Sequence, residues 1–273
     1  RNARVFDSEH ARLGPPADVY VNHGRIAGIY EAGSVTQGAA SVVDAGGRVL
    51  LPGLFDMHVH LGPWDGGLHL AAGVTTVRDM GADNAVLAEN IALIDGGRAI
   101  GPRVVAAGYI EGASEHKSSG GFTVASLDEV KRAIDWYAQR GYPQIKLYNS
   151  FRREWVEGTT AYAHQRGLRV SGHVPAFMRA EEVVAMGYDE LQHMNQLFLN
   201  FLSKPETDSR TLARFYLIAE NAHALDLGSP RVQKFVKLLK DRGTVVDPTL
   251  GTFGFMAYKQ GEVNPPFAPV VDH

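Results

Sequence analysis

Residues 51–60 read Leu51-Pro52-Gly53-Leu54-Phe55-Asp56-Met57-His58-Val59-His60, and they mark a change in the pattern of the chain. Successive side chains of a strand point to opposite faces. The apolar members of this strand are predicted to face outward, where helices would cover them: Phe55, Met57 and Val59. Asp56, His58 and His60 are then predicted to share the inner face.

Two imidazoles two residues apart on one strand can chelate one divalent ion. An isolated His-x-His pair is also compatible with structural or surface histidines. The position of His58 and His60 favours a functional role, because both lie where a strand runs into a loop. In a parallel barrel, this end of the strands carries the active site.

After Pro52, short apolar stretches alternate with amphipathic helical stretches, which is typical of parallel βαβ units. Seven stretches are predicted to be strands: Gly53–His60, Thr75–Asp79, Arg103–Tyr109, Gln144–Tyr148, Arg169–Val174, Glu190–His193 and Thr244–Pro248. We expect residues 53–273 to form an α/β barrel of the TIM-like (β/α)8 type. Because the eighth strand is missing, we expect residues outside this sequence to complete the barrel; the alternative is an open sheet.

Residues 1–52 have a different pattern and are predicted to form a small β-rich unit. Two alternating stretches, Asp18–Asn22 and Arg25–Tyr30, flank His23-Gly24, which is a hairpin signature. Val42–Leu50 repeats the alternation.

Composition excludes several functional classes. The 273 residues include no Cys, so neither disulfides nor thiolate metal ligands are available, whereas 11 His can serve as ligands. The formal net charge of −3 gives no reason to expect a nucleic acid or an acidic membrane surface as partner. No apolar run has the length of a membrane span. The compartment stays open, since cytoplasmic and periplasmic or secreted locations are all compatible with these features.

Lys146 lies in Gln144-Ile145-Lys146-Leu147-Tyr148, where the alternation predicts that Ile145 and Leu147 face the helices and Lys146 faces the interior. A buried, unpaired ammonium group is very unfavourable. Lys146 is therefore predicted either to pair with an inward carboxylate such as Asp56 or to lose its proton and react with CO₂. The resulting carbamate would be an anionic ligand with two oxygens.

Two further histidines, His173 and His193, end the predicted strands Arg169–Val174 and Glu190–His193. A lone histidine in such a place is often structural. However, the chain offers inward His, His, Lys, His and His at successive strand ends, and this order is difficult to explain by chance.

This order resembles the amidohydrolase superfamily, and in particular its imidazolonepropionase-like and Xaa-Pro dipeptidase-like branches. The N-terminal β unit and three sequence motifs carry the resemblance. The motifs are Leu51–His60, Gly73-Val74-Thr75-Thr76-Val77-Arg78-Asp79-Met80-Gly81 and Gly167-Leu168-Arg169-Val170-Ser171-Gly172-His173. The resemblance implies that residues 1–52 belong to a small β-sandwich and that the barrel holds a metal-dependent hydrolase.

The resemblance further implies a binuclear centre with two divalent metal ions, zinc by default. His58 and His60 would hold the first ion, His173 and His193 the second, and carboxylated Lys146 would bridge them. A metal-bound hydroxide would then cleave an amide C–N bond of a small substrate, such as a dipeptide or an N-acyl amino acid. Hydrolysis of a cyclic amide, a lactone or an ester by the same centre is an alternative.

Other residues around this centre have less certain roles. Tyr148 shares the inward face of Lys146 and would hydrogen-bond the substrate or its oxyanion, or else be a packed core phenol. His116 and Lys117 lie in a Ser/Gly-rich loop and would contact a substrate carboxylate, or else be solvated. Arg78 and Asp79 are predicted to form a structural ion pair.

One departure from the family concerns an aspartate at the end of strand 8. Asp247 belongs to the predicted seventh strand and Asp272 to an extended tail, so neither fits this role. A barrel that has lost its chemistry and acts as a scaffold is therefore the alternative to an enzyme. The expected partners are a small molecule or dipeptide, with a homo-oligomer also compatible, and neither nucleic acid nor membrane is expected.

Overall fold

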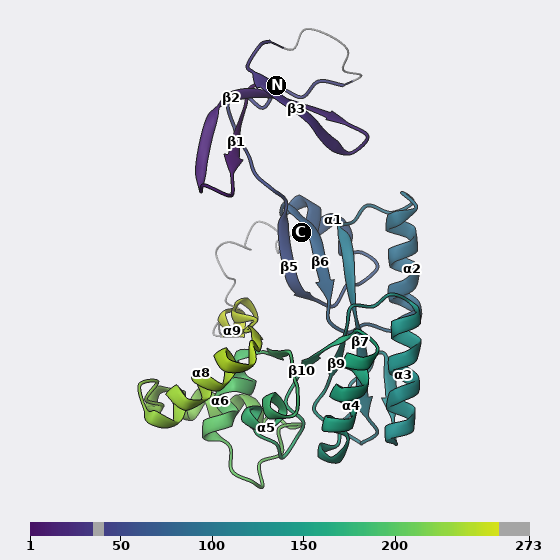
Figure 1. Cartoon of the computed structure of the whole chain (residues 1–273), viewed down its shortest axis with the longest axis vertical. Coiled ribbons are helices and arrows are strands. Elements are labelled where there is room, and N and C mark those ends of the chain that lie inside the picture. Colours follow the sequence, from purple (N-terminus) through teal and green to yellow (C-terminus); the bar gives the residue numbers. More distant parts are fainter. Residues whose placement is uncertain (35–40, 257–273) are drawn as a thin grey trace. The chain divides into compact units, whose positions relative to one another are not determined.

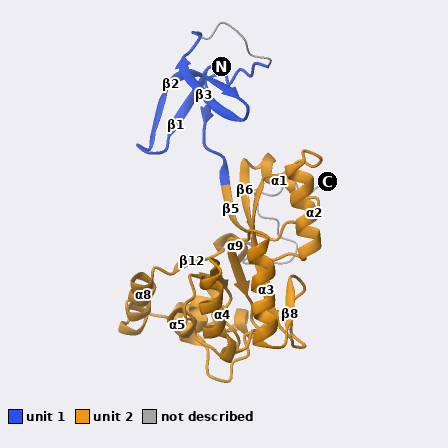
Figure 2. Ribbon diagram, turned by 45° about the vertical axis from the view of Figure 1, so that its right-hand side comes forward, with its two compact units in different colours: residues 1–54 blue, residues 55–273 orange. Residues whose placement is uncertain are grey.

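The structure is a computed structural model that describes residues 1–34 and 41–256 (Figure 1). It divides into two compact units, Arg1–Leu54 and Phe55–His273 (Figure 2). Asp272, considered above for the role of the strand-8 aspartate, lies outside the described residues.

The first unit is one four-stranded sheet in the order β3-β2-β1-β4. Its strands are β1 (Ala3–Asp7), β2 (Arg12–Asn22), β3 (Arg25–Glu31) and β4 (Val49–Leu50). The predicted hairpin is confirmed: β2 and β3 are antiparallel and are joined by His23 and Gly24, which both have positive φ. The predicted strand at Val42–Leu50 is reduced to β4, because Gly46 and Gly47 turn the chain with φ of 57° and 80°.

The second unit contains a parallel, nearly closed sheet in the order β12-β11-β10-β9-β7-β6-β5. Its seven strands are β5 (Leu54–Val59), β6 (Val74–Asp79), β7 (Arg103–Gly112), β9 (Gln144–Leu147), β10 (Arg169–Gly172), β11 (Glu190–Gln192) and β12 (Val245–Asp247). This confirms the predicted TIM-like architecture and its seven strands. A short additional strand, β8 (Phe122–Val124), pairs with the end of β7.

Helices alternate with these strands. They are α1 (Gly66–Ala71), α2 (Asn84–Asp95), α3 (Leu127–Gln139), α4 (Arg153–Gln165), α5 (Ala180–Ala185), α6 (Met194–Leu202), α7 (Ala213–Asn221), α8 (Pro230–Arg242) and α9 (Leu250–Met256). Within the described ranges, none of them is long and apolar enough to cross a membrane.

The main core lies between the middle strands and their covering helices. Ile145 and Leu147 of β9 are fully buried there, together with Val130 of α3 and Val156 of α4. Complete burial of such a side chain stabilises the fold by about 1.5–3 kcal/mol. Lys146 lies between the two apolar residues of β9 and, by strand alternation, faces the other way.

The outer face of β5 departs from the prediction that helices cover it. Val59 is buried, but Phe55 and Met57 are 67% and 50% exposed. The reason is that β5 is an edge strand of the described sheet, so its first residues lack the neighbours that enclose a central strand.

Candidate metal centre

Five of the predicted site residues lie at the ends of strands in the same sheet. His58 is in β5 and His60 follows it, Lys146 is in β9, His173 follows β10, and His193 follows β11 directly before α6. Since all these strands are parallel, their carboxyl ends meet at one edge of the sheet.

The four imidazole rings form one continuous cluster. The ring centroid of His58 lies 5.5 Å from that of His60 and 4.6 Å from that of His193. The rings of His193 and His173 are 4.5 Å apart. The structure thus brings together histidines from three strands that are far apart in the sequence.

Each ring is oriented by a hydrogen bond to its Nδ1 atom. The partners are Asp247 Oδ2 at 2.6 Å for His58, the Gly81 carbonyl at 2.7 Å for His60, Thr249 Oγ1 at 2.8 Å for His193, and Asn149 Oδ1 for His173. A carbonyl or carboxylate oxygen accepts the proton on Nδ1 of a neutral imidazole, which leaves Nε2 with its lone pair. This is the arrangement by which proteins orient metal-binding histidines.

The Nε2 atoms have little to bond within the protein. His173 Nε2 is buried and has no hydrogen-bond partner among the described residues. His58 Nε2 lies 3.3 Å from Nζ of Lys146. A buried nitrogen lone pair without a partner is costly, and a bound divalent cation would remove that cost. The donor set therefore fits a metal ion.

The electrostatics of the cluster keep these rings neutral. Burial lowers the pKa of His58, His60 and His173, and it lowers the pKa of His193 to about 2. The positive charge of Lys146 adds to this effect at each ring. Neutral imidazole is the form that ligates metals, so a ligand-competent state prevails at neutral pH.

Lys146 is fully buried, and burial lowers the pKa of its ammonium group to about 7. The alternative pairing with Asp56 does not form among the described residues. Asp56 Oδ1 instead accepts a hydrogen bond from the backbone N–H of His58 at 3.1 Å. Lys146 Nζ instead lies 3.3 Å from Nε2 of His58, which is two residues further along β5 than Asp56.

The predicted ion pair between Arg78 and Asp79 is wrong. These residues are neighbours on β6, so their side chains point to opposite faces of the strand. Asp79 accepts hydrogen bonds from the backbone N–H groups of Leu61 and Gly81, at 2.7 Å and 2.9 Å.

Arg78 instead makes a bidentate pair with Glu190 of β11, with both N···O distances at 2.7 Å. Its Nη2 atom also lies 3.2 Å from Asp247 Oδ2, the same oxygen that bonds His58. Arg78, Glu190 and Asp247 therefore form a buried ionic network beside the ring of His58.

Sequence reasoning did not assign the Nδ1 partners Asp247, Asn149 and Thr249 to the centre. A signal was available, because each is a polar residue that ends or closely follows a strand: Asp247 ends β12, Thr249 comes two residues later, and Asn149 comes two residues after β9. In a parallel barrel, such residues face the mouth.

Tyr148 lies in the cluster, but His116 does not. The ring of Tyr148 is 3.9 Å from the ring of His173, and Lys146 Nζ lies 5.7 Å from its centroid. Within the described residues, His116 contacts Ser114, whose hydroxyl accepts its backbone N–H, and Glu115 at 3.7 Å. A role for His116 in binding substrate stays a prediction.

Two backbone features position the histidines after β10 and β11. Gly172 has a φ of 138°, and a Cβ atom there would lie 2.1 Å from the Leu147 carbonyl oxygen, so only glycine fits before His173. His193 has a φ of 66°, an uncommon value for a residue with a side chain. Such strain costs on the order of 1–3 kcal/mol and often occurs at functional sites.

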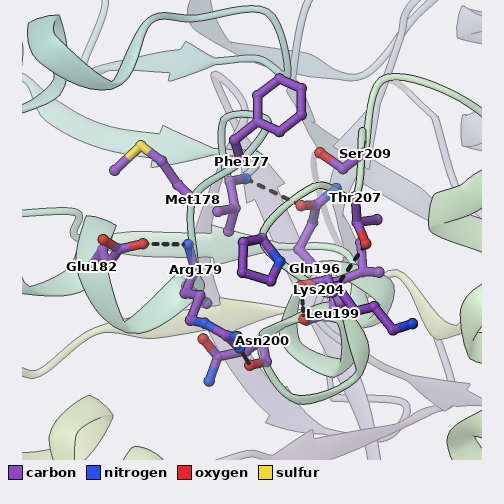
Figure 3. Close-up of a pocket in the computed structure, with 14 residues that line it drawn as sticks. Phe177, Met178, Arg179, Glu182, Gln196, Leu199, Asn200, Lys204, Thr207 and Ser209 are labelled. Carbon is purple, nitrogen blue, oxygen red and sulfur yellow. Dashed lines mark hydrogen bonds between the residues drawn. The ribbon is translucent and has the colours of Figure 1, made fainter.

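A cavity of about 210 Å³ lies beyond β10, between the loop that follows this strand and α6 (Figure 3). Gln196 and Asn200 from α6 line it, together with Arg179 and Lys204. Val174, the residue after His173, also lines the cavity, and its backbone N–H donates to Gln196 Oε1 at 3.3 Å. None of the four histidines is among the lining residues.

Comparison with known proteins gives short sequence matches and several matching folds. No protein-family model matches the chain. Over 61 residues, the chain is 39% identical to an adenine deaminase of Chelativorans sp. (strain BNC1). This match covers 22% of the chain and 10% of the deaminase.

Among solved structures, bottromycin amidohydrolase aligns with a TM-score of 0.60 at 22% identity, over 80% of this chain and 46% of that one. A Xaa-Pro dipeptidase with methionine bound in its active site aligns with a TM-score of 0.54 at 18% identity, over 89% of this chain and 76% of that one. The chain thus spans about half the length of the first protein. These likenesses show that the chain shares the fold of these two proteins. They agree with the resemblance that the sequence motifs carry.

Proposed function

We propose that the protein is a metal-dependent hydrolase that cleaves the amide bond of a small substrate, such as a dipeptide or an N-acyl amino acid. In this proposal two divalent ions, zinc by default, bind at the carboxyl ends of the strands. His58 and His60 would hold the first ion, and His173 and His193 would hold the second. Lys146, as a carbamate, would supply the anionic oxygen ligands of the centre.

The observation that carries the proposal is the orientation of the four imidazoles. Each has its Nδ1 atom bonded to an outer partner, which leaves its Nε2 atom on the other side of the ring, and His58 Nε2 lies 3.3 Å from Nζ of the buried Lys146. A structural cluster of histidines has no need of an unpartnered buried nitrogen such as His173 Nε2. In a metal centre this nitrogen would be a ligand.

Lys146 has the chemistry that a carbamate requires. A neutral amine attacks CO₂, a C–N bond forms and one proton leaves, which gives a carbamate with one negative charge. The pKa of about 7 makes the neutral amine available near physiological pH. The negative charge would also compensate the ions bound by neutral imidazoles.

Bound divalent ions would lower the pKa of water towards neutrality and polarise the carbonyl of the scissile bond. The chain's own residues would hold these ions at the mouth of the barrel, where substrate enters. We assign to the Tyr148 hydroxyl a hydrogen bond to the substrate or its oxyanion, because the ring of Tyr148 contacts that of His173. The outer partners Asp247, Gly81, Asn149 and Thr249 would keep the rings fixed during turnover.

Two measurements on the purified full-length protein test the proposal. Elemental analysis is expected to find two divalent ions per chain, and a panel of dipeptides, N-acyl amino acids, cyclic amides, lactones and esters is expected to show amide hydrolysis. A single ion with unmodified Lys146 would contradict the binuclear centre. Absence of bound metal together with no hydrolysis would favour a non-catalytic scaffold.

A further inference from the structure

The cavity between α6 and the loop after β10 is lined by two buried amide groups with unused donors. Gln196 and Asn200 lie four residues apart on α6, so they share one face of the helix (Figure 3). Their exposed fractions are only 2% and 1%. Among the described residues, neither Gln196 Nε2 nor Asn200 Nδ2 has a hydrogen-bond partner. A buried N–H group without an acceptor is unfavourable, so a ligand that supplies acceptors would be stabilised here.

The oxygen of each amide is already engaged, which settles how the two groups are oriented. Gln196 Oε1 accepts from the backbone N–H of Val174, and Asn200 Oδ1 accepts from the backbone N–H of Glu181, both at 3.3 Å. Turning either amide around would place its NH₂ group against another N–H donor. The unused end of each group is therefore a donor, and a ligand must offer acceptor oxygens.

The charges of the cavity wall favour an anionic ligand. Arg179 and Lys204 line it, and Glu182 is its acidic residue. Glu182 is already bonded, because one of its oxygens accepts from the guanidinium group of Arg153 and the other from the backbone N–H of Arg179. In the described part of the chain, neither Arg179 nor Lys204 forms an ion pair. The wall thus has a net positive charge.

The rest of the wall is mostly apolar. Met178 and Leu199 are buried, whereas Phe177 is 54% exposed and has a φ of 65°, an uncommon value for an aromatic residue. The volume of about 210 Å³ is well above the roughly 30 Å³ that one water occupies in the liquid. A few polar groups on an apolar wall are typical of small-molecule sites. The cavity therefore suits an acid with a small apolar body.

We propose that this cavity binds a small carboxylic acid. The amide nitrogens of Gln196 and Asn200 supply the hydrogen-bond donors for its oxygens, and the exposed Lys204 supplies a compensating charge. Leu199 and Met178 contact its apolar body. The site is distinct from the four histidines and does not depend on the proposed hydrolase activity.

Two hydrogen-bonded links connect the cavity wall to His173. Val174, which donates to Gln196, directly follows His173. The carbonyl of Ser209, another residue of the wall, accepts from Asn149 Nδ2 at 2.7 Å, and Asn149 Oδ1 bonds Nδ1 of His173. The acid can therefore come from two sources: a carboxylate group of the substrate itself, or a separate acid bound beside the centre.

The test measures binding of benzoate and of the neutral benzamide to the full-length, metal-loaded protein by calorimetry. Benzoate is expected to bind at least about tenfold more tightly, because hydrogen bonds to a charged group are stronger. Gln196→Glu keeps the oxygen that accepts from Val174 and replaces the donor by an anionic oxygen. It is expected to weaken benzoate binding by about 10- to 100-fold.

Exchange of an exposed residue avoids any effect on folding. Lys204→Gln is expected to weaken benzoate binding by about two- to fivefold, which is the usual effect of one surface charge. Lys240→Gln removes an exposed lysine of α8 that does not line the cavity, and it should leave binding unchanged. If Gln196→Glu does not fold, this pair of lysine variants decides the outcome.

A carboxylate can also ligate a metal ion, so His58→Ala separates the two sites. Benzoate binding is expected to persist in this variant. Loss of binding in His58→Ala together with normal binding in Gln196→Glu and Lys204→Gln would place benzoate on the metal and overturn the proposal. Absence of benzoate binding by the wild type, or equal binding of benzamide, would also overturn it.

Inhibition kinetics distinguish the two sources of the acid. Benzoate that raises KM and leaves kcat unchanged in the hydrolysis assay, but not in Gln196→Glu, would assign the site to a carboxylate of the substrate. Calorimetric binding without competition would assign it to a separate acid. Where no compound in the panel is hydrolysed, the proposed function fails, but the calorimetric comparison of Gln196→Glu with the wild type still tests the cavity.

Discussion

The Nδ1 atom of His58 lies 2.6 Å from Oδ2 of Asp247, although 189 residues separate them in the sequence. His58 belongs to β5 and Asp247 to β12, the two edge strands of the described sheet. The contact therefore joins the first and last described strands of the barrel. It also fixes the ring whose Nε2 atom lies 3.3 Å from Nζ of Lys146.

Asp247→Asn is expected to weaken metal binding by about 10- to 100-fold, the usual effect of losing an outer partner of a ligating histidine. The amide keeps the shape of the carboxylate but no longer enforces one orientation of the proton on His58. Competition with a chelator of known affinity measures the change. Asp241→Asn, which alters an exposed carboxylate paired with Lys237 on α8, is the matched control and should bind metal normally.

His58→Ala and His60→Ala are each expected to remove most activity and leave the fold largely intact. Barrel stability comes mainly from the packed layers of side chains, and each histidine is replaced at the mouth of the barrel. Turnover assays test the loss of activity, and circular dichroism tests whether the fold is retained. Near-normal turnover of either variant in metal-free buffer would show that the proposed centre is not the catalytic one.

Lys146→Ala is expected to lose both metal ions or to bind them weakly. Acetate or formate at high concentration should restore part of the activity, because a small carboxylate can occupy the space of the carbamate. Reconstitution of the wild type should depend on bicarbonate. A Lys146→Ala variant that is destabilised but still binds two zinc ions would contradict the carbamate.

The stability of the metal-free protein is expected to depend on pH through Lys146. Burial lowers the pKa of this lysine from 10.5 to about 7. Between these two values the unfolded chain binds a proton that the folded chain does not, so the free energy of unfolding rises with pH. The slope approaches about 1.4 kcal/mol per pH unit. Urea denaturation from pH 7 to 10 should show this slope in the wild type, and Lys146→Met should lack it.

Arg78→Met is expected to lower the free energy of unfolding by about 3–5 kcal/mol, because Glu190 would remain buried without its cation. Lys237→Met removes the cation of an exposed pair on α8 and should cost less than about 0.5 kcal/mol. Chemical denaturation measures the free energy of unfolding of both variants. Equal, small effects would mean that water or a relaxed conformation compensates Glu190.

The order of elements and the facing of most site residues follow from local patterns. The period of two in Gln144–Leu147 predicts that Ile145 and Leu147 pack against helices and that Lys146 faces inward, and the structure has this arrangement. The same period explains the one ion pair that was predicted wrongly. Adjacent residues of β6 point to opposite faces, so Arg78 and Asp79 cannot pair across the strand.

Partners across the barrel could not be derived in this way. Strand alternation decides the face on which a side chain lies, but not which residue meets it from another strand. That depends on strand stagger and on sheet closure. Strand stagger and sheet closure bring Lys146 to His58 and not to Asp56. They also bring Arg78 to Glu190, 112 residues away in the sequence.

The sequence by itself determined the parallel barrel, the N-terminal hairpin and the five ligand candidates, because backbone geometry imposes these patterns residue by residue. Only the tertiary structure decided that the four rings form one cluster with outer partners on Nδ1, and that Arg78 pairs with Glu190. Those contacts join segments from different strands and loops. Their distances are set by the packing of the whole barrel, which no local period encodes.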